Sequence, residues 1–136
     1  MGNDLEKHLI VRFLPSGVDN IYQLEYGIKQ SNRIDVSQRL GDNMYRLRFQ
    51  VIALAILSFL KQNPKALIRF SANDQTRMRL FTIWISSNWD FVNQHFVLYG
   101  YTAMNRWKLF EKNHSYLAIT VKLIQYSTYE RNSYKS

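Results

Sequence analysis

The chain has no cysteine among its 136 residues, and it has only two prolines and five glycines. Without cysteine it cannot form disulfide bonds, Cys-ligated zinc sites, iron–sulfur clusters or a thiol nucleophile. Hydrophobic residues make up 46% and charged residues 21%, which excludes a disordered, collagen-like or linker-dominated chain. Because a chain of this length buries about 68% of its unfolded surface, one core can form without metal or disulfide support.

No hydrophobic run is long enough to cross a membrane. The longest, 51–60, would span about 15 Å as a helix, which is half of the ~30 Å hydrocarbon core of a bilayer. The N-terminal residues mix acidic and basic side chains with short apolar pieces, unlike a secretory signal. We therefore expect a cytoplasmic protein without a transmembrane segment.

Positive charge is in excess and is unevenly placed. The chain carries 18 Lys and Arg against 10 Asp and Glu, a net charge of +8, and its pI is about 9.8. Residues 21–70 contribute +5 and residues 91–136 contribute +4. This excess favours an anionic partner such as nucleic acid, an acidic protein or anionic lipid, although a basic surface can also serve solubility alone. Candidates for a basic patch are Arg33, Arg39, Arg46 and Arg48.

Strand patterns occur in both halves of the chain. In 21–28, Tyr22, Leu24 and Tyr26 alternate with the other side chains, so we expect these three to face the core. Turn residues bound most of the other short apolar segments. The expected strands are 9–13, 21–28, 34–36, 66–70, 96–102, 107–110 and 116–124.

The strongest helix pattern covers about 43–62. It ends at Asn63-Pro64, because the residue before a proline avoids the α conformation. Residues 51–57 are apolar all round, which predicts a helix packed deeply across a sheet. One stripe along it consists of Leu47, Val51, Leu54 and Phe59.

A second main helix is expected at about 75–88, and a helical turn follows at 89–93. The order of elements is strands, helix, strand, helix, strands, which is typical of the α+β class. We expect a single domain over 1–125, with a mostly antiparallel sheet packed against two main helices. Residues 126–136 are polar and are expected to form a frayed basic tail.

The segment 73–79 joins a strand end to a helix start and carries two arginines. Free N–H groups and the helix dipole favour an anion there, and the same dipole disfavours arginine in the first turn. The compensating negative charge is either an internal carboxylate, Asp74 or Glu111, or a bound phosphate or carboxylate. Two residues apart on a helix, the arginines point about 200° from each other and cannot both contact one ligand unless the helix starts later. The candidate anion ligands are Asn73, Thr76, Arg77 and Arg79.

Histidines are few and scattered, and none forms a metal-binding pair on a helix. We therefore expect no metal and no cofactor. His95 and His114 can meet across the C-terminal sheet, where an arginine would complete an acid–base set able to cleave RNA. Surface or capping histidines are the commoner situation. Glu111 is the accompanying candidate general base.

Aromatic residues make up 15% of the chain, and many lie in its second half. On a sheet face beside Arg106, Lys108 and Lys122, such rings can stack single-stranded bases. At alternating strand positions, aromatic side chains more often fill the core. The chain lacks the aromatic run of an RNA-recognition motif, which argues against that module.

Several short motifs occur in one order between residue 20 and residue 123. They are Asn20-Ile21-Tyr22, Tyr26-Gly27, Gly41-Asp42, Asn63-Pro64, Arg77-x-Arg79-Leu80-Phe81, Tyr99-Gly100, Trp107-x-x-Phe110-Glu111 and Tyr116. On these motifs the chain resembles a family of small bacterial proteins built on a domain of unknown function. The family's usual Gly-Ser-Thr before Arg-x-Arg is Ala72-Asn73-Asp74 here, and its pattern has no counterpart of His114. The resemblance implies a single α+β domain and supplies no activity.

These observations leave three functional hypotheses. The first is a module that binds an anionic partner, RNA or DNA above all. The second is a ribonuclease-type toxin of a toxin–antitoxin pair, because such proteins are often small, basic and short of conventional catalytic residues. The third is a protein–protein adaptor that self-associates through an aromatic sheet, which includes a homo-oligomer.

Overall fold

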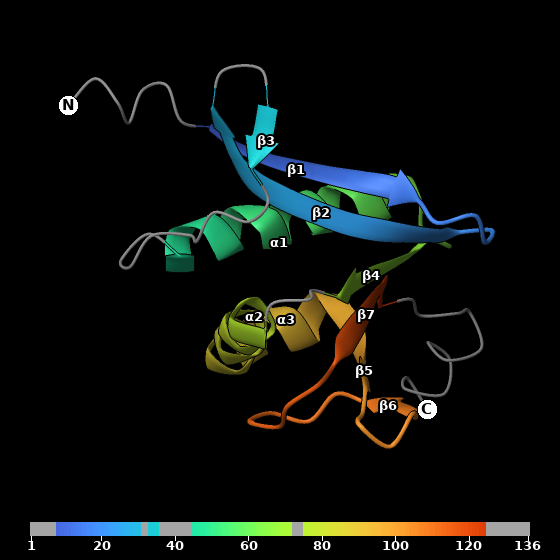
Figure 1. Cartoon of the computed structure of the whole chain (residues 1–136). Coiled ribbons are helices and arrows are strands. Elements are labelled where there is room, and N and C mark those ends of the chain that lie inside the picture. Colours follow the sequence, from blue (N-terminus) through green and yellow to red (C-terminus); the bar gives the residue numbers. More distant parts are fainter. Residues whose placement is uncertain (1–7, 31–32, 36–44, 72–74, 125–136) are drawn as a thin grey trace.

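The computed structural model describes residues 8–30, 33–35, 45–71 and 75–124 (Figure 1). The strands are β1 (His8–Pro15), β2 (Ile21–Gln30), β3 (Arg33–Asp35), β4 (Leu67–Ser71), β5 (Phe96–Tyr101), β6 (Trp107–Leu109) and β7 (Ala118–Leu123). The helices are α1 (Tyr45–Gln62), α2 (Gln75–Ser87) and α3 (Trp89–His95). The α+β class is therefore confirmed. The prediction of two main helices is incomplete, because α3 is a helix of seven residues rather than a single turn, with Asp90 favourably placed in its first turn.

The strands form one mixed sheet in the order β1-β2-β4-β7-β5-β6, and β3 pairs with β2 beside this path. Among the described strands, only β2 and β4 pair in parallel; all other pairs are antiparallel. A parallel pair needs a crossover connection, and α1 lies in the connection between β2 and β4. The expected mostly antiparallel sheet is confirmed.

Helix α1 packs beneath the β1–β2 part of the sheet (Figure 1). The Phe59 ring stacks on Phe13 with centroids 4.5 Å apart and meets the Tyr22 ring edge-on at 4.9 Å. Leu24 and Tyr26 are 3% and 2% exposed, so the predicted inward set of β2 is confirmed. Alternation in this strand was sufficient to assign its faces.

The predicted packing stripe of α1 is wrong at three of its four residues, since only Phe59 packs against the sheet. Leu47, Val51 and Leu54 are about half exposed, at 54%, 46% and 50%. The residues of α1 that enter the core are Phe49, Ile52, Ala53, Ile56, Leu57 and Leu60. Because 51–57 is apolar on every side, its sequence does not distinguish the inner face from the outer one.

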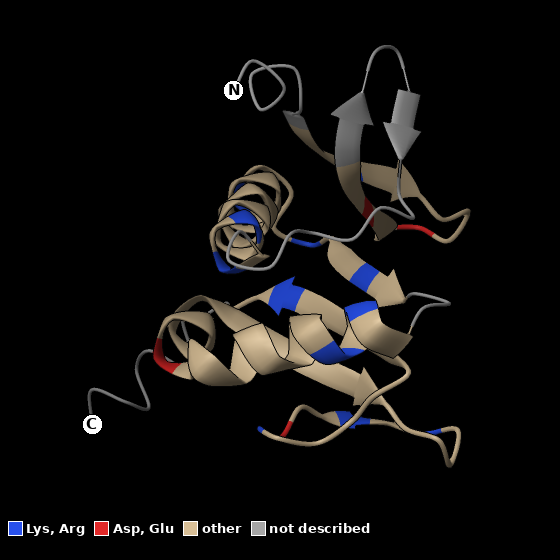
Figure 2. Cartoon of the chain, turned by 60° about the vertical axis from the view of Figure 1, so that its left-hand side comes forward, with Lys and Arg blue, Asp and Glu red and all other residues tan. Residues whose placement is uncertain are grey.

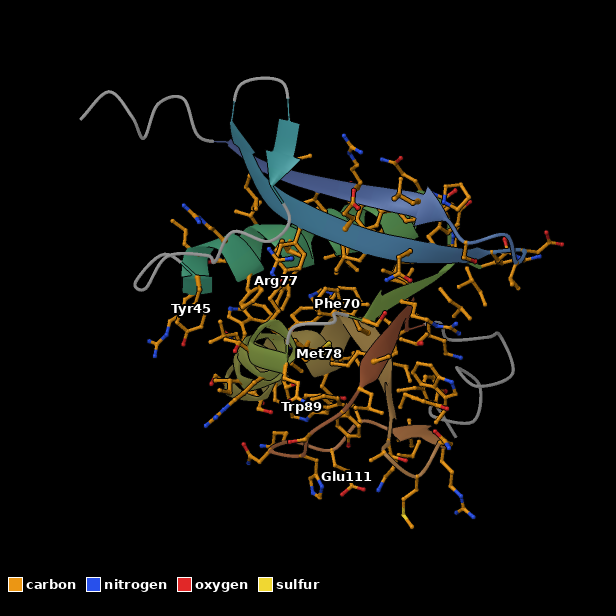
Figure 3. The ribbon with its side chains drawn as sticks, viewed as in Figure 1. Tyr45, Phe70, Arg77, Met78, Trp89 and Glu111 are labelled. Atoms are coloured by element: carbon orange, nitrogen blue, oxygen red, sulfur yellow. The ribbon has the colours of Figure 1, made fainter. Side chains whose placement is uncertain are left out.

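The helices α2 and α3 cover the other part of the sheet through aromatic contacts. The Phe70 ring of β4 meets Phe81 of α2 edge-on, with centroids 4.7 Å apart. Trp89 of α3 stacks on Phe110 at 5.6 Å. Figure 3 shows Phe70, Met78 and Trp89 directed into the interior between helices and strands. The core therefore lies on one side of the β4–β7 part of the sheet.

The opposite side of these strands carries different residues. In β5, Phe96, Leu98 and Gly100 are buried, whereas the side chains between them are only partly buried. We call the side that contacts the helices the inner face and the other the outer face. Cross-strand partners share a face, and the registers place on the outer face Leu67, Arg69, Ser71, Val97, Tyr99, Tyr101, Trp107, Leu109, Ala118, Thr120 and Lys122. The aromatic residues of the second half are thus divided between the core and the outer face.

Among the helices within the described ranges, none is both long and apolar enough to cross a membrane. The expected extent of the domain, 1–125, and the expected frayed tail, 126–136, are not tested, because the ends of the chain lie outside the described residues.

Candidate anion-binding site

A cavity of about 610 Å³ lies between α2 and the loop that precedes β7. This volume is within the range of sites for small ligands. We call this cavity the α2 pocket. One wall is a single face of α2, with residues at helical spacing: Gln75, Met78, Arg79, Thr82, Ile83 and Ser86. The other wall is formed by Ala103, Asn113, His114, Ser115, Tyr116 and Leu117.

The Tyr116 ring lies against the backbone of Gly100 in β5 and anchors the second wall. A Cβ atom at position 100 would lie 2.6 Å from Cγ of Tyr116 and closer to two other ring carbons, so only glycine leaves space for the ring. The backbone N–H of Glu111 donates a hydrogen bond of 2.9 Å to the Tyr116 hydroxyl. The Phe110 ring packs on Tyr116 with centroids 5.1 Å apart. These contacts fix the loop before any ligand binds.

A second link ties the loop to α2. The backbone N–H of Asn113 donates to Oγ of Ser86 at 3.1 Å, across 27 residues of sequence. Asn113 has φ 65°, a left-handed conformation that asparagine tolerates better than most residues. The backbone N–H of Leu117 donates to the carbonyl of Tyr101 at 2.8 Å. The two walls of the α2 pocket therefore hold each other in place.

The lining of the α2 pocket is cationic. Among its described lining residues, Arg79 has the only fixed charge and none is a carboxylate. Arg79 forms no ion pair with any residue in the described ranges. His114 adds a second positive charge when it is protonated. A pocket with this lining favours an anion.

Glu111 lies beside the α2 pocket and contacts His114, one of the residues that line it. Its Oε1 is 3.4 Å from Nε2 of His114, and its Oε2 is 3.1 Å from Nζ of Lys108. The hydrogen bond from Lys108, with the charges of Lys108 and His114, lowers the pKa of Glu111 below its usual value. The carboxylate therefore stays ionised and orients the imidazole.

The two arginines of the Arg-x-Arg motif point in different directions, as the sequence predicted. The guanidinium of Arg77 lies over the ring of buried Tyr26, 5.0 Å from its centroid, on the side of α2 that faces β2 (Figure 3). Arg79 instead lines the α2 pocket. Thr76 is exposed in the first turn of α2, and Asn73 lies outside the described residues. Of the two carboxylates considered as compensators of these arginines, Glu111 contacts Lys108 and His114 instead, and Asp74 lies outside the described residues.

His95 and His114 do not meet, so the acid–base pair that the sequence allowed as the less common alternative does not form. His95 ends α3 at the start of β5 and contacts the rings of Phe91 and Phe96. His114 lies at the other end of β5, next to the segment in which Leu117 bonds to the last residue of that strand. The length of β5 separates the two imidazoles.

Only part of the predicted basic patch is described. Arg46 is exposed in the first turn of α1, where its Nε donates to the hydroxyl of Tyr45 at 3.3 Å, and this bond raises the pKa of Arg46. Arg48 is partly buried in the same helix. Arg39 and the side chain of Arg33 lie outside the described residues.

Sequence reasoning missed the residues that build the pocket walls. Thr82 and Ser86 could have been found by extending the helical period from Arg79. The contact of Asn113 with Ser86 has no local signal, because it depends on how a distant loop docks onto α2. In the described part of the chain, no group of three or more potential metal-binding residues comes together.

The fold and the pocket define a small α+β domain with a preformed cationic cavity beside one helix. The chain belongs to a family of unknown function, DUF6934, whose model matches residues 2–124. No match is found among curated proteins. None is found among solved structures.

Proposed function

We propose that this protein is a nucleic-acid-binding module and that its α2 pocket holds one phosphate group. The observation that carries the proposal is Arg79, a guanidinium in a lined cavity with no ion-pair partner among the described residues. A planar guanidinium donates two parallel hydrogen bonds to a phosphate. His114, oriented by Glu111, is placed to add a third donor. The net charge of +8 supports a polyanionic partner.

The proposal predicts a salt-dependent interaction. Purified protein freed of nucleic acid is titrated with labelled RNA and DNA between about 50 and 200 mM salt. We expect Arg79→Ala to weaken binding about tenfold or more, because one charge-assisted contact is lost. The slope of log K against log salt should fall by about 0.7–0.9, the contribution of one phosphate.

Lys65→Ala is the matched control, since it removes one exposed positive charge next to the start of β4. The α2 pocket borders the other end of β4, where Ser71 pairs with Ala118 next to the pocket residue Leu117. We expect this variant to leave the slope of log K against log salt nearly unchanged. The absence of salt-dependent binding by the unmodified protein would remove the proposal, and an equal effect of both variants would remove the pocket from it.

A metal-independent ribonuclease is the second candidate, and the contact between Glu111 and His114 favours it. In that reaction His114 takes the proton of a ribose 2′-hydroxyl while the 2′-oxygen bonds to phosphorus. The bond from phosphorus to the 5′-oxygen breaks, water protonates that oxygen, and a 2′,3′-cyclic phosphate and a 5′-hydroxyl remain. Arg79 stabilises the additional negative charge on the phosphorane.

Expression of the protein alone in a bacterial host tests this second candidate. We expect growth arrest and RNA fragments ending in 2′,3′-cyclic phosphate, and we expect His114→Ala to abolish both. His95→Ala is the control, because it removes a histidine from the other end of β5. Normal growth with intact RNA would exclude the ribonuclease and leave the binding module.

A further inference from the structure

On strands β4–β7 the outer face bears cations and aromatic rings and no acidic residue; Glu25 of the neighbouring β2 shares this face and is ion-paired with Arg12. The cations on these strands' outer face are Arg69 of β4 and Lys122 of β7, and the four strands contain no Asp or Glu (Figure 2). Lys108 of β6 pairs with Gly100 and so lies on the inner face. The helices contact the inner face of these strands (Figure 1). A sheet surface with cationic and aromatic side chains, and no acidic residue on these four strands, is complementary to a polyanion that carries flat bases.

Cation–ring contacts extend across this face. The guanidinium of Arg69 on β4 lies 5.1 Å from the ring centroid of Trp107 on β6. Nζ of Lys122 lies 6.0 Å from the Tyr99 centroid, and the Tyr101 ring is 5.0 Å from Trp107. The contact of Arg69 with Trp107 passes over the two intervening strands, β7 and β5. The Tyr101 and Trp107 rings are in contact, and Tyr99 lies on the same face two residues along β5 from Tyr101. We call these three residues, Tyr99, Tyr101 and Trp107, the aromatic platform.

Two polar atoms at the centre of this face lack partners. Nε of Arg69 and Oγ1 of Thr120 are buried and form no hydrogen bond in the described structure. Thr120 is only 6% exposed, and it pairs across the sheet with Arg69 on one side and with Tyr99 on the other. A buried donor or acceptor without a partner is uncommon in native proteins, and a ligand is one of its explanations.

We propose that the outer face binds a single strand of nucleic acid, with bases stacked on the aromatic platform and phosphates held by Arg69 and Lys122. This inference extends the proposed function and rests on it for the identity of the polyanion, but it uses different residues. Trp107 is 40% exposed, so a base can stack on its ring. Arg69 is released from Trp107 when a phosphate offers it a stronger partner than the ring does.

A duplex does not fit this arrangement, because its bases are already stacked on each other and cannot lie flat on the rings. A single strand has its bases free, and every base offers a π face, so little sequence preference is expected. The contribution of stacking is about 5- to 150-fold in affinity for each base stacked on an aromatic ring.

The experiment compares a labelled single-stranded oligonucleotide of about eight nucleotides with an abasic oligonucleotide of the same length. Both have the same phosphates, so only stacking distinguishes them. We expect the intact strand to bind at least fivefold more tightly than the abasic strand. Trp107→Leu should remove most of the preference for the intact strand while leaving abasic binding unchanged.

Met104→Ala is the matched control, since Met104 is 82% exposed in the turn before β6 and lies off the platform. This variant should not change the preference for the intact strand over the abasic strand. Arg79→Ala should weaken the intact and abasic strands by the same factor, which separates the α2 pocket from the platform. Equal affinity for intact and abasic strands would overturn this inference alone. No binding of either strand would overturn the proposed function as well.

Discussion

Gly100→Ala should destabilise the protein and disrupt the α2 pocket at the same time. The added Cβ would overlap the ring of Tyr116, with Cγ at 2.6 Å and two ring carbons closer. Gly100 is buried within β5, so its backbone cannot move away without disturbing the pairs with β6 and β7. The Tyr116 ring must therefore be displaced.

The magnitude follows from two losses. Forcing an additional carbon into a packed core costs about 1–3 kcal/mol. Displacing the ring also breaks the hydrogen bond from the Glu111 backbone N–H to the Tyr116 hydroxyl, which is worth about 0.5–1.5 kcal/mol. We expect the free energy of unfolding to fall by about 2–4 kcal/mol, which lowers Tm by roughly 6–16 °C in a domain of this size.

Chemical denaturation followed by circular dichroism measures the change. A double-mutant cycle with Tyr116→Ala then identifies its cause, because the three atoms nearest to the added Cβ all belong to the Tyr116 ring. We expect Gly100→Ala to cost little in the Tyr116→Ala background. Oligonucleotide affinity measured on the folded variant should fall with the loss of the pocket wall.

Gly17→Ala is the control, because Gly17 has φ +95° and no atom lies within 4 Å of the place that a Cβ would occupy. It should cost about 1 kcal/mol through backbone strain alone and leave oligonucleotide affinity unchanged. If Gly100→Ala unfolded at the same denaturant concentration as the unmodified protein, the close packing of Tyr116 on Gly100 would be refuted.

Three further predictions concern other parts of the fold. Val51→Ala should cost under about 1 kcal/mol and Ile52→Ala about 2–4 kcal/mol in denaturation, and equal costs would contradict the observed orientation of α1. Thr120→Val should leave stability unchanged or raise it by about 1 kcal/mol, because a buried hydroxyl without a partner is removed; a clear loss would show that this hydroxyl is hydrogen-bonded. Lys108→Ala should raise the pKa of Glu111 in an NMR titration. Since that pKa is lowered by folding, its small stabilising effect is present above the unfolded value of 4.5 and is lost as the pH falls through the folded value.

The sequence predicted those features that depend on local periodicity. Alternation with a period of two assigned Tyr22, Leu24 and Tyr26 to the core, because neighbouring strand residues must face opposite sides. The rotation of 100° per residue in a helix similarly separated Arg77 from Arg79, and the structure places them on different sides of α2.

Features that depend on the packing of distant segments could not be predicted in this way. In α1, an apolar sequence on every side gave no basis for preferring Ile52 over Val51, and only the position of the sheet decides between them. The α2 pocket depends on the docking of Asn113 onto Ser86, far apart in the sequence. His95 and His114, which the sequence left free to meet, lie near opposite ends of β5 and do not meet.

The surface of the β4–β7 strands argues for an anionic partner over self-association through the aromatic sheet. The edge strand β6 has only three residues and carries Lys108, two features that disfavour pairing of sheet edges. Two copies meeting by their outer faces would bring Arg69 and Lys122 of one copy against the same residues of the other, without an acidic residue on these strands to compensate. Like charges placed together across an interface cost several kcal/mol, about as much as a few stacked rings contribute. A polyanion removes this repulsion and leaves the rings available for stacking.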